Sequence, residues 1–120
     1  MLKVLFVDDE PFILDAYLRM LRNTSFQCFT LSDSRQLFQH PAISELDIIV
    51  VDQQMPHVTG IEIVQKLEQH FPHIKRVLIS GDLDYALREL STTATTATID
   101  AALQKPFTKA VLLDCLLTLI

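Results

Sequence analysis

The sequence predicts an α/β fold, a doubly wound five-stranded parallel sheet with helices on both faces. Strand-like and helix-like segments alternate along the 120 residues, and such alternation is typical of parallel sheets. Residues 4–7 and 48–51 are entirely apolar, as expected for strands buried on both faces. Hydrophobic residues make up 49% of the chain, which is enough for a substantial core.

The expected strands are separated by segments with helical patterns. In chain order, the strands are predicted at residues 3–7, 27–31, 47–51, 75–79 and 101–104. No linker, repeat or block of charge interrupts this order. We therefore expect a single domain over residues 1–120.

Start and stop signals support the helices between these strands. Pro11 suits the first turn of a helix, and apolar residues at helical spacing follow it. Thr59 is a good N-cap for a helix with an apolar face. Residues 33–40 and 82–90 predict shorter helices, and Pro106 is expected to open the last helix. The threonine-rich segment that follows residue 90 predicts a frayed helix end or a mobile loop.

Composition argues against several classes of function. The net charge of -5 and the lack of a basic stripe argue against direct binding to nucleic acid. The apolar-rich residues 111–120 are too few to span a membrane. Cys28 and Cys115 form no CxxC pair, so free thiols in a reducing, cytoplasmic compartment are expected.

The residues that follow the predicted strands are the candidate site residues, because ligands bind at the carboxyl ends of strands in open α/β sheets. They comprise three acids, a hydroxyl and an amine: Asp8, Asp9, Asp52, Ser80 and Lys105. Three carboxylates a few ångströms apart repel one another, and a divalent cation with oxygen ligands would neutralise them. The sequence therefore predicts a metal site suited to phosphoryl chemistry.

Each of these residues also has a simpler interpretation when it is considered alone. Asp8 or Asp9 could cap a helix, and Asp52 could begin a turn. Ser80 could lie in a turn with the following glycine, and Lys105 could be a solvated surface lysine. The metal site is favoured because these simpler interpretations would all have to hold at once on one rim of the sheet.

The order and spacing of these residues resemble the receiver domains of two-component response regulators. Five features spread over essentially the whole chain carry the resemblance: Asp8-Asp9, Asp52-Gln53-Gln54-Met55-Pro56, Gly60-Ile61-Glu62, Ser80-Gly81 and Lys105-Pro106-Phe107. The resemblance implies a flavodoxin-like, CheY-like sheet with strand order 2-1-3-4-5.

The resemblance also implies a role for each acid. Asp52 would be the phosphoacceptor, a carboxylate nucleophile. Asp9 would ligate Mg²⁺ directly and Asp8 mainly through water. Asp52 and the backbone carbonyl of Gln54 would complete the protein's share of an octahedral oxygen shell.

The remaining implied roles concern the phosphoryl group and its donor. Lys105 would pair with a phosphoryl oxygen, and Ser80 would donate a hydrogen bond to the same group. The donor would be a histidine kinase or a phosphotransfer protein. The outcome would be a switch in contacts with an effector that the sequence does not name, rather than metabolic catalysis. The chain could be the N-terminal part of a longer response regulator.

Two departures from the family pattern suggest alternatives. Ala102 stands where receiver domains usually carry Tyr or Phe, and alanine has no rotamer to switch. This raises a second hypothesis, a pseudo-receiver that acts as a constitutive interaction or dimerisation module. The last helix is apolar nearly all round, so we expect self-association through the face formed by residues 101–120.

A metabolic enzyme on a similar sheet fits less well. A phosphatase of the haloacid dehalogenase type would carry a second Asp two residues after the nucleophile, where Gln54 stands. A flavin-binding protein would place a phosphate loop after the first strand, where Asp8 and Asp9 would repel the phosphate.

Overall fold

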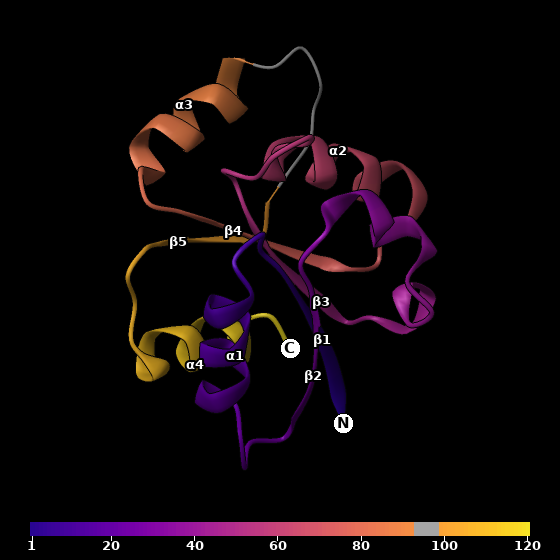
Figure 1. Ribbon diagram of the computed structural model, residues 1–120, viewed down its shortest axis with the longest axis vertical. Coiled ribbons are helices and arrows are strands. Elements are labelled where there is room, and N and C mark those ends of the chain that lie inside the picture. Colours follow the sequence, from indigo (N-terminus) through magenta and orange to yellow (C-terminus); the bar gives the residue numbers. More distant parts are fainter. Residues whose placement is uncertain (93–98) are drawn as a thin grey trace.

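Five parallel strands form one sheet, in the order β2-β1-β3-β4-β5, in the computed structural model, which describes residues 1–92 and 99–120 (Figure 1). The strands are β1 (Leu2–Val7), β2 (Phe26–Leu31), β3 (Ile48–Asp52), β4 (Lys75–Ser80) and β5 (Ala101–Gln104). The predicted fold class and strand order are confirmed. The central strands are buried on both faces, which explains why their sequences are continuous apolar runs.

Helices cover both faces of the sheet. They are α1 (Pro11–Met20), α2 (Gly60–His70), α3 (Leu83–Thr92) and α4 (Lys109–Leu117), with two short 3₁₀ helices, η1 (Ser34–Gln39) and η2 (Ile43–Glu45). Figure 1 shows α1 and α4 on one side of the sheet, and α2 and α3 on the other. Alternate strand residues therefore fill two separate cores: Phe6 packs with the first helix pair, and Leu5 with the second.

Local chemistry explains where the observed elements differ from the expected ones. The last helix begins at Lys109 rather than Pro106, because the hydroxyl of Thr108 caps it by accepting a hydrogen bond from the amide of Val111, 3.2 Å away. The helix expected at residues 33–40 is the 3₁₀ helix η1. Helix α3 continues to Thr92, and the rest of the threonine-rich segment lies outside the described residues.

Strand register brings distant acids together. Val7 of β1 pairs with Val51 of β3, so Asp8, directly after β1, and Asp52, the last residue of β3, lie together at the carboxyl ends of neighbouring strands. Gly60 lets α2 pass close to these ends. A Cβ on Gly60 would lie 2.7 Å from the carbonyl oxygen of Asp52 and 2.8 Å from Leu78 Cδ1. Only glycine fits at this crossing.

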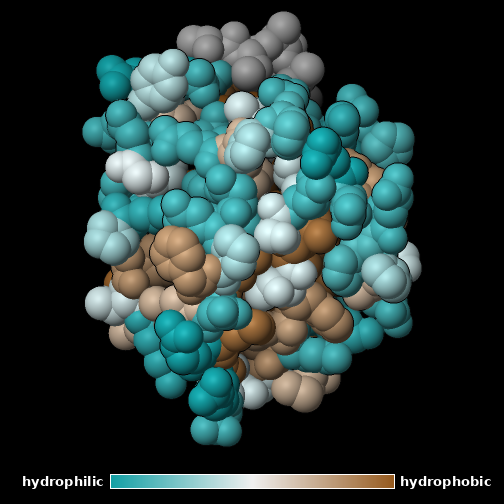
Figure 2. All heavy atoms as spheres, in the orientation of Figure 1, coloured by the Kyte–Doolittle hydropathy of each residue, from teal (hydrophilic) through white to brown (hydrophobic). Residues whose placement is uncertain are grey.

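The face of the molecule shown in Figure 2 is unevenly polar. Hydrophobic side chains reach the surface mainly in the lower half of Figure 2, where Figure 1 places α1 and α4. In residues 1–92 and 99–120, no helix has both the length and the apolarity that crossing a bilayer requires.

Candidate functional site

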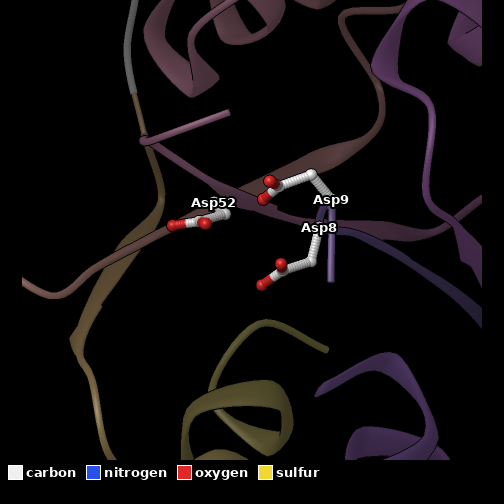
Figure 3. A group of neighbouring side chains, drawn as sticks. All are labelled: Asp8, Asp9 and Asp52. Carbon is white, nitrogen blue, oxygen red and sulfur yellow. The ribbon is translucent and has the colours of Figure 1, made fainter. Parts of the chain in front are cut away.

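Three carboxylates converge at the carboxyl ends of β1 and β3 (Figure 3). Asp8, Asp9 and Asp52 each offer an oxygen, and these oxygens all lie within 4.8 Å of one another. Asp8 is fully buried and Asp52 is 5% exposed, whereas Asp9 faces solvent. The predicted convergence of these residues is confirmed.

The hydrogen bonds do not support the simpler interpretation that Asp8 or Asp9 caps α1. Glu10 occupies the N-cap position, and its side chain makes no cap hydrogen bond. Asp8 instead accepts a hydrogen bond from the backbone amide of Glu10 at 3.0 Å.

Lys105 supplies the positive charge of the site. Its Nζ lies 2.8 Å from Asp8 Oδ2 and 3.3 Å from Asp52 Oδ2. The lysine follows β5, and its backbone amide donates to the carbonyl of Ser80 at 2.8 Å, which fixes the end of β5 against the end of β4. Sheet pairing thus brings the ammonium group to two acids that lie 97 and 53 residues earlier in the chain.

The environment changes the pKa values of both partners. Burial raises the pKa of Asp52 above its ordinary value; Lys105 opposes this shift, and the charge of Asp8 adds to it. Burial alone would lower the pKa of Lys105, but its hydrogen bond to Asp8 and the charge of Asp52 raise it to about 12. Asp52 is thus a carboxylate whose negative charge is only partly neutralised by the protein.

Ser80 and Gln54 lie beside this cluster. Ser80 follows Ile79, the residue that pairs with Asp52, and its side chain is fully buried. Its Oγ accepts a hydrogen bond from the amide of Asp82 at 3.0 Å, so the hydroxyl hydrogen can still be donated elsewhere. The backbone amide of Gln54 interacts with the carboxylate of Asp52 and opposes the rise in its pKa. A metal-binding role for the Gln54 carbonyl stays a prediction.

The donor set fits a hard divalent cation. Carboxylate oxygens from three residues lie close to one another, with Lys105 as a counter-charge. Mg²⁺ prefers such oxygen ligands and retains several waters, so two or three carboxylates suffice to hold it. The exposure of Asp9 leaves one side of the cluster open to solvent and to a ligand.

A groove with mostly apolar walls adjoins the cluster. It has a volume of about 340 Å³ and lies between α1 and the residues that follow β5. Tyr17 and Phe107 stack across it, with ring centroids 5.7 Å apart, and Lys105 borders it. Burial and the nearby carboxylates outweigh the opposing charge of Lys105 and raise the pKa of Tyr17 to about 12. Tyr17 is therefore a neutral, apolar wall at physiological pH.

Sequence reasoning assigned no role to Gln53, a buried polar residue next to Asp52. Its side-chain oxygen accepts from the amide of Ile61 and its side-chain nitrogen donates to Glu89, both at 2.9 Å. The available signal was an amide side chain immediately after a fully apolar strand, where an unpaired polar group would be costly.

Comparisons with known proteins agree with this geometry. A family model described as the response regulator receiver domain matches residues 4–117. The chain is 30% identical over 112 residues to the C4-dicarboxylate transport transcriptional regulatory protein DctD of Pseudomonas aeruginosa, a match that covers 93% of this chain and 24% of that protein. It is 37% identical over 84 residues to the hydrogenase transcriptional regulatory protein HoxA of Cupriavidus necator, covering 68% of this chain and 17% of HoxA.

A solved structure shows the same fold. The response regulator protein TrrA of Thermotoga maritima, determined in complex with Mg²⁺-BeF, matches with a TM-score of 0.84 at 22% identity and covers 100% of both chains. The chain spans a quarter or less of the length of DctD and HoxA. Because the family model extends over nearly all of the chain, the protein belongs to the response regulator receiver domain family.

Proposed function

We propose that this chain is a phosphorylatable receiver domain of a two-component system, in which Asp52 accepts a phosphoryl group from a histidine kinase or a phosphotransfer protein. The observation that carries the proposal is the position of Asp52. Its carboxylate lies close to two other acids and to Lys105 at the carboxyl ends of the central strands. This arrangement suits a nucleophile that receives an anionic group with the help of cations.

The transfer step would form one bond and break another. A carboxylate oxygen of Asp52 would attack phosphorus, while the bond from phosphorus to the donor's imidazole nitrogen breaks. The bonding electron pair would stay on that nitrogen, which would take up a proton from solvent. The product would be an acyl phosphate on Asp52. The chain would promote its own modification and would not be a metabolic enzyme.

Mg²⁺ is the proposed cofactor, held by Asp8, Asp9, Asp52 and the backbone carbonyl of Gln54. When bound, it would neutralise charge on the phosphoryl oxygens. The protein's own groups would complete the stabilisation. Lys105 is within ion-pair distance of Asp52 and could exchange that contact for a phosphoryl oxygen.

Ser80 would contribute a neutral hydrogen bond. Its hydroxyl is buried and already oriented by the amide of Asp82, so ordering it would cost little entropy when it donates to the phosphoryl group.

The groove beside Lys105 is the proposed contact surface for the phosphoryl donor. Its walls include Ile13, Tyr17, Met20 and Phe107, and apolar side chains of this kind are enriched at the cores of protein interfaces. A donor that docks there would present its phosphorylated histidine at the carboxylates. Phosphorylation would then change the contacts of this chain with an effector. We propose that the phosphoryl transfer takes place in the cytoplasm.

Phosphate incorporation tests the proposal. The chain would be incubated with acetyl phosphate and Mg²⁺ and analysed by intact-protein and peptide mass spectrometry. We expect one added phosphoryl group on Asp52, none in Asp52→Asn, and normal incorporation in Asp15→Asn, an exposed acid of α1. Modification of a different residue would contradict the assignment of Asp52.

The same measurement separates a second candidate, a pseudo-receiver that acts as a constitutive interaction module. Ala102 favours that candidate, because its side chain cannot report on the site by changing rotamer. A folded chain that takes up no phosphate would support the pseudo-receiver and reject phosphoacceptance.

A homodimer through residues 101–120 is a further part of the proposal. Val111, Leu117 and Ile120 are exposed although α4 is otherwise packed on the sheet through Leu112 and Leu116. Sedimentation velocity over a range of concentrations would test it. We expect a concentration-dependent dimer in the wild type and a monomer in Val111→Asp; a monomeric wild type would reject the dimer.

A further inference from the structure

Gln53 directly follows the proposed phosphoacceptor, and its hydrogen bonds connect it to three other elements. Its backbone amide donates to the carbonyl of Ile79 at 2.9 Å, and its carbonyl accepts from the amide of Gly60 at 3.2 Å. The side-chain oxygen accepts from the amide of Ile61, in the first turn of α2, at 2.9 Å. The side-chain nitrogen donates to Oε2 of Glu89, on α3, at 2.9 Å.

These bonds fix the Gln53 side chain in one orientation. The residue is only 4% exposed, and a buried amide that loses its partners leaves unsatisfied polar groups that destabilise the fold. Turning the amide over would place its NH₂ group against the amide of Ile61 and its oxygen against the carboxylate of Glu89. The hydrogen bonds therefore specify a single arrangement, so a displacement of Gln53 must be transmitted to its partners or break a bond.

Glu89 extends the connection to the molecular surface. The half-buried side chain of Glu89 also interacts with the phenol of Tyr85, one turn earlier on the same helix, and this interaction raises the pKa of Tyr85. Tyr85 is 52% exposed. The hydrogen bond from Gln53 thus connects the residue after Asp52 to a carboxylate that interacts with an exposed aromatic side chain on α3.

The site contacts α3 at two separated points. Ser80 Oγ accepts from the amide of Asp82, directly before the helix, and Gln53 holds Glu89 in its second half. A phosphoryl group on Asp52 would add about two negative charges and would attract the Ser80 hydroxyl. Because α3 is short and begins directly after Asp82, a shift of the backbone at Asp82 would move the whole helix. That movement would change the geometry of the hydrogen bond between Gln53 and Glu89.

We propose that the Gln53–Glu89 hydrogen bond couples phosphorylation of Asp52 to the order and position of helix α3. The inference rests on the proposed function of Asp52 and names the route by which that site reaches the surface. The two states are α3 with Glu89 held by Gln53, as in this structure, and α3 with that bond rearranged. The surface that changes is the exposed side of α3, which carries Tyr85 and Leu87.

Amide hydrogen exchange with and without a phosphoryl mimic tests this coupling. Beryllofluoride with Mg²⁺ would be added to the whole chain, its binding followed by ¹⁹F NMR, and exchange measured across α3. In the wild type we expect exchange of the α3 amides to change by roughly three- to tenfold, the effect of one hydrogen bond gained or lost. In Glu89→Ala we expect the mimic to bind and the α3 response to be lost.

Matched variants separate the coupling from general effects on the helix. Glu89→Gln keeps a carbonyl acceptor for Gln53 and should retain most of the response. Asp84→Ala removes the same charge from an exposed position on α3 and should respond like the wild type. Gln53→Leu should lose the response, as Glu89→Ala does. Gln53→Leu also removes the hydrogen-bond acceptor of the Ile61 amide, so Glu89→Ala is the more specific test of the Gln53–Glu89 bond.

The outcomes distinguish failure of the coupling from failure of the proposed function. A wild type that does not bind the mimic and takes up no phosphate rejects phosphoacceptance itself. A wild type that binds without a change in α3, or a Glu89→Ala variant with an undiminished response, overturns the coupling alone. Loss of binding in Glu89→Ala would also overturn it, because the pair would then be part of the binding site rather than a link from it.

Discussion

Nζ of Lys105 lies 2.8 Å from Oδ2 of Asp8, although 97 residues separate them in the chain. The carboxylate of Asp8 is fully buried, whereas the side chain of Lys105 is 23% exposed. Among the described residues, Lys105 is the cation that forms an ion pair with Asp8. A buried carboxylate is tolerated only when it is paired or neutralised. Lys105 therefore neutralises part of the negative charge of the cluster, and a bound metal ion would neutralise more of it.

Removing the ammonium group should therefore destabilise the metal-free protein. We expect Lys105→Met to lower the free energy of unfolding by about 2 kcal/mol, because it leaves Asp8 and Asp52 close together without a cation. Urea titration in the presence of a chelator would measure it. Lys109→Met, an exposed change at the start of α4, should stay within about 0.5 kcal/mol. Equal stability of the two variants would show that the ion pairs contribute nothing net.

Neutralising Asp52, in contrast, should raise the free energy of unfolding of the metal-free protein. The pKa of Asp52 is raised, so its ionised form is disfavoured in the folded state, and the folded protein loses stability as pH rises through that pKa. Asp52→Asn should consequently be more stable than the wild type at neutral pH without metal. Its advantage should shrink as pH falls and the wild-type carboxyl takes up a proton. Urea unfolding across the acidic range would check this trend, and a constant difference between the two proteins would contradict it.

Mg²⁺ should stabilise the fold by binding the acid cluster. A ligand at a hundred times its dissociation constant adds about 2.7 kcal/mol to the free energy of unfolding when it binds only the folded state. We expect a rise in the thermal midpoint with Mg²⁺ for the wild type and for Asp15→Asn. The rise should be much smaller for Asp9→Asn, which lacks one of the three clustered carboxylates. An equal rise in all three proteins would place the ion elsewhere.

A methyl group should destabilise the protein at one of the two glycines of the chain and have little effect at the other. Gly60→Ala forces Cβ to within 2.7 Å of the Asp52 carbonyl oxygen and 3.0 Å of Gln53 Cα, which are backbone atoms that cannot move aside. We expect a loss of about 2 kcal/mol and weaker Mg²⁺ binding, because the displaced backbone carries Asp52. Gly81→Ala meets nothing within 4 Å and should be neutral within about 0.5 kcal/mol. Differential scanning calorimetry with and without Mg²⁺ would compare the two.

Stability should fall at alkaline pH for two reasons that act in the same direction. The pKa of Lys105 rises from 10.5 to about 12 on folding, so the stability contributed by its charge is complete below pH 10.5 and is lost as pH approaches 12. The pKa of Tyr17 rises from 10.0 to about 12, so the folded state keeps a proton that the unfolded state releases, and stability falls over that interval too.

Variants separate these two contributions. Tyr17→Phe and Lys105→Met should each flatten the decline in urea-derived stability between pH 10 and pH 12. The tyrosinate absorbance of the wild type should show a late step near pH 12 that is absent from Tyr17→Phe. A single step near pH 10 for both tyrosines would contradict the buried environment assigned to Tyr17.

The order of elements could be read from the chain because each depends on local chemistry. Continuous apolar runs marked the central strands, and Pro11 and Thr59 marked helix starts that the structure contains. Local signals also misled at one point: Pro106 suggested a helix start, but the hydroxyl of Thr108 sets the cap and the backbone before it forms a loop. Two start signals only two residues apart compete here, and the structure shows that the one with a side-chain cap prevails.

The sequence by itself determined which residue types lie at the end of each strand. Because parallel strands all point in the same direction, their carboxyl ends meet at one end of the sheet. The meeting of acids, a hydroxyl and an amine there could therefore be predicted. Only the tertiary structure decided which of these groups are in contact. That Lys105 pairs with both Asp8 and Asp52, that Gly60 has no room for a side chain, and that Gln53 holds Glu89 depend on the register of neighbouring strands and the packing of helices over them. Register and packing are set by the whole core, and no local pattern contains them.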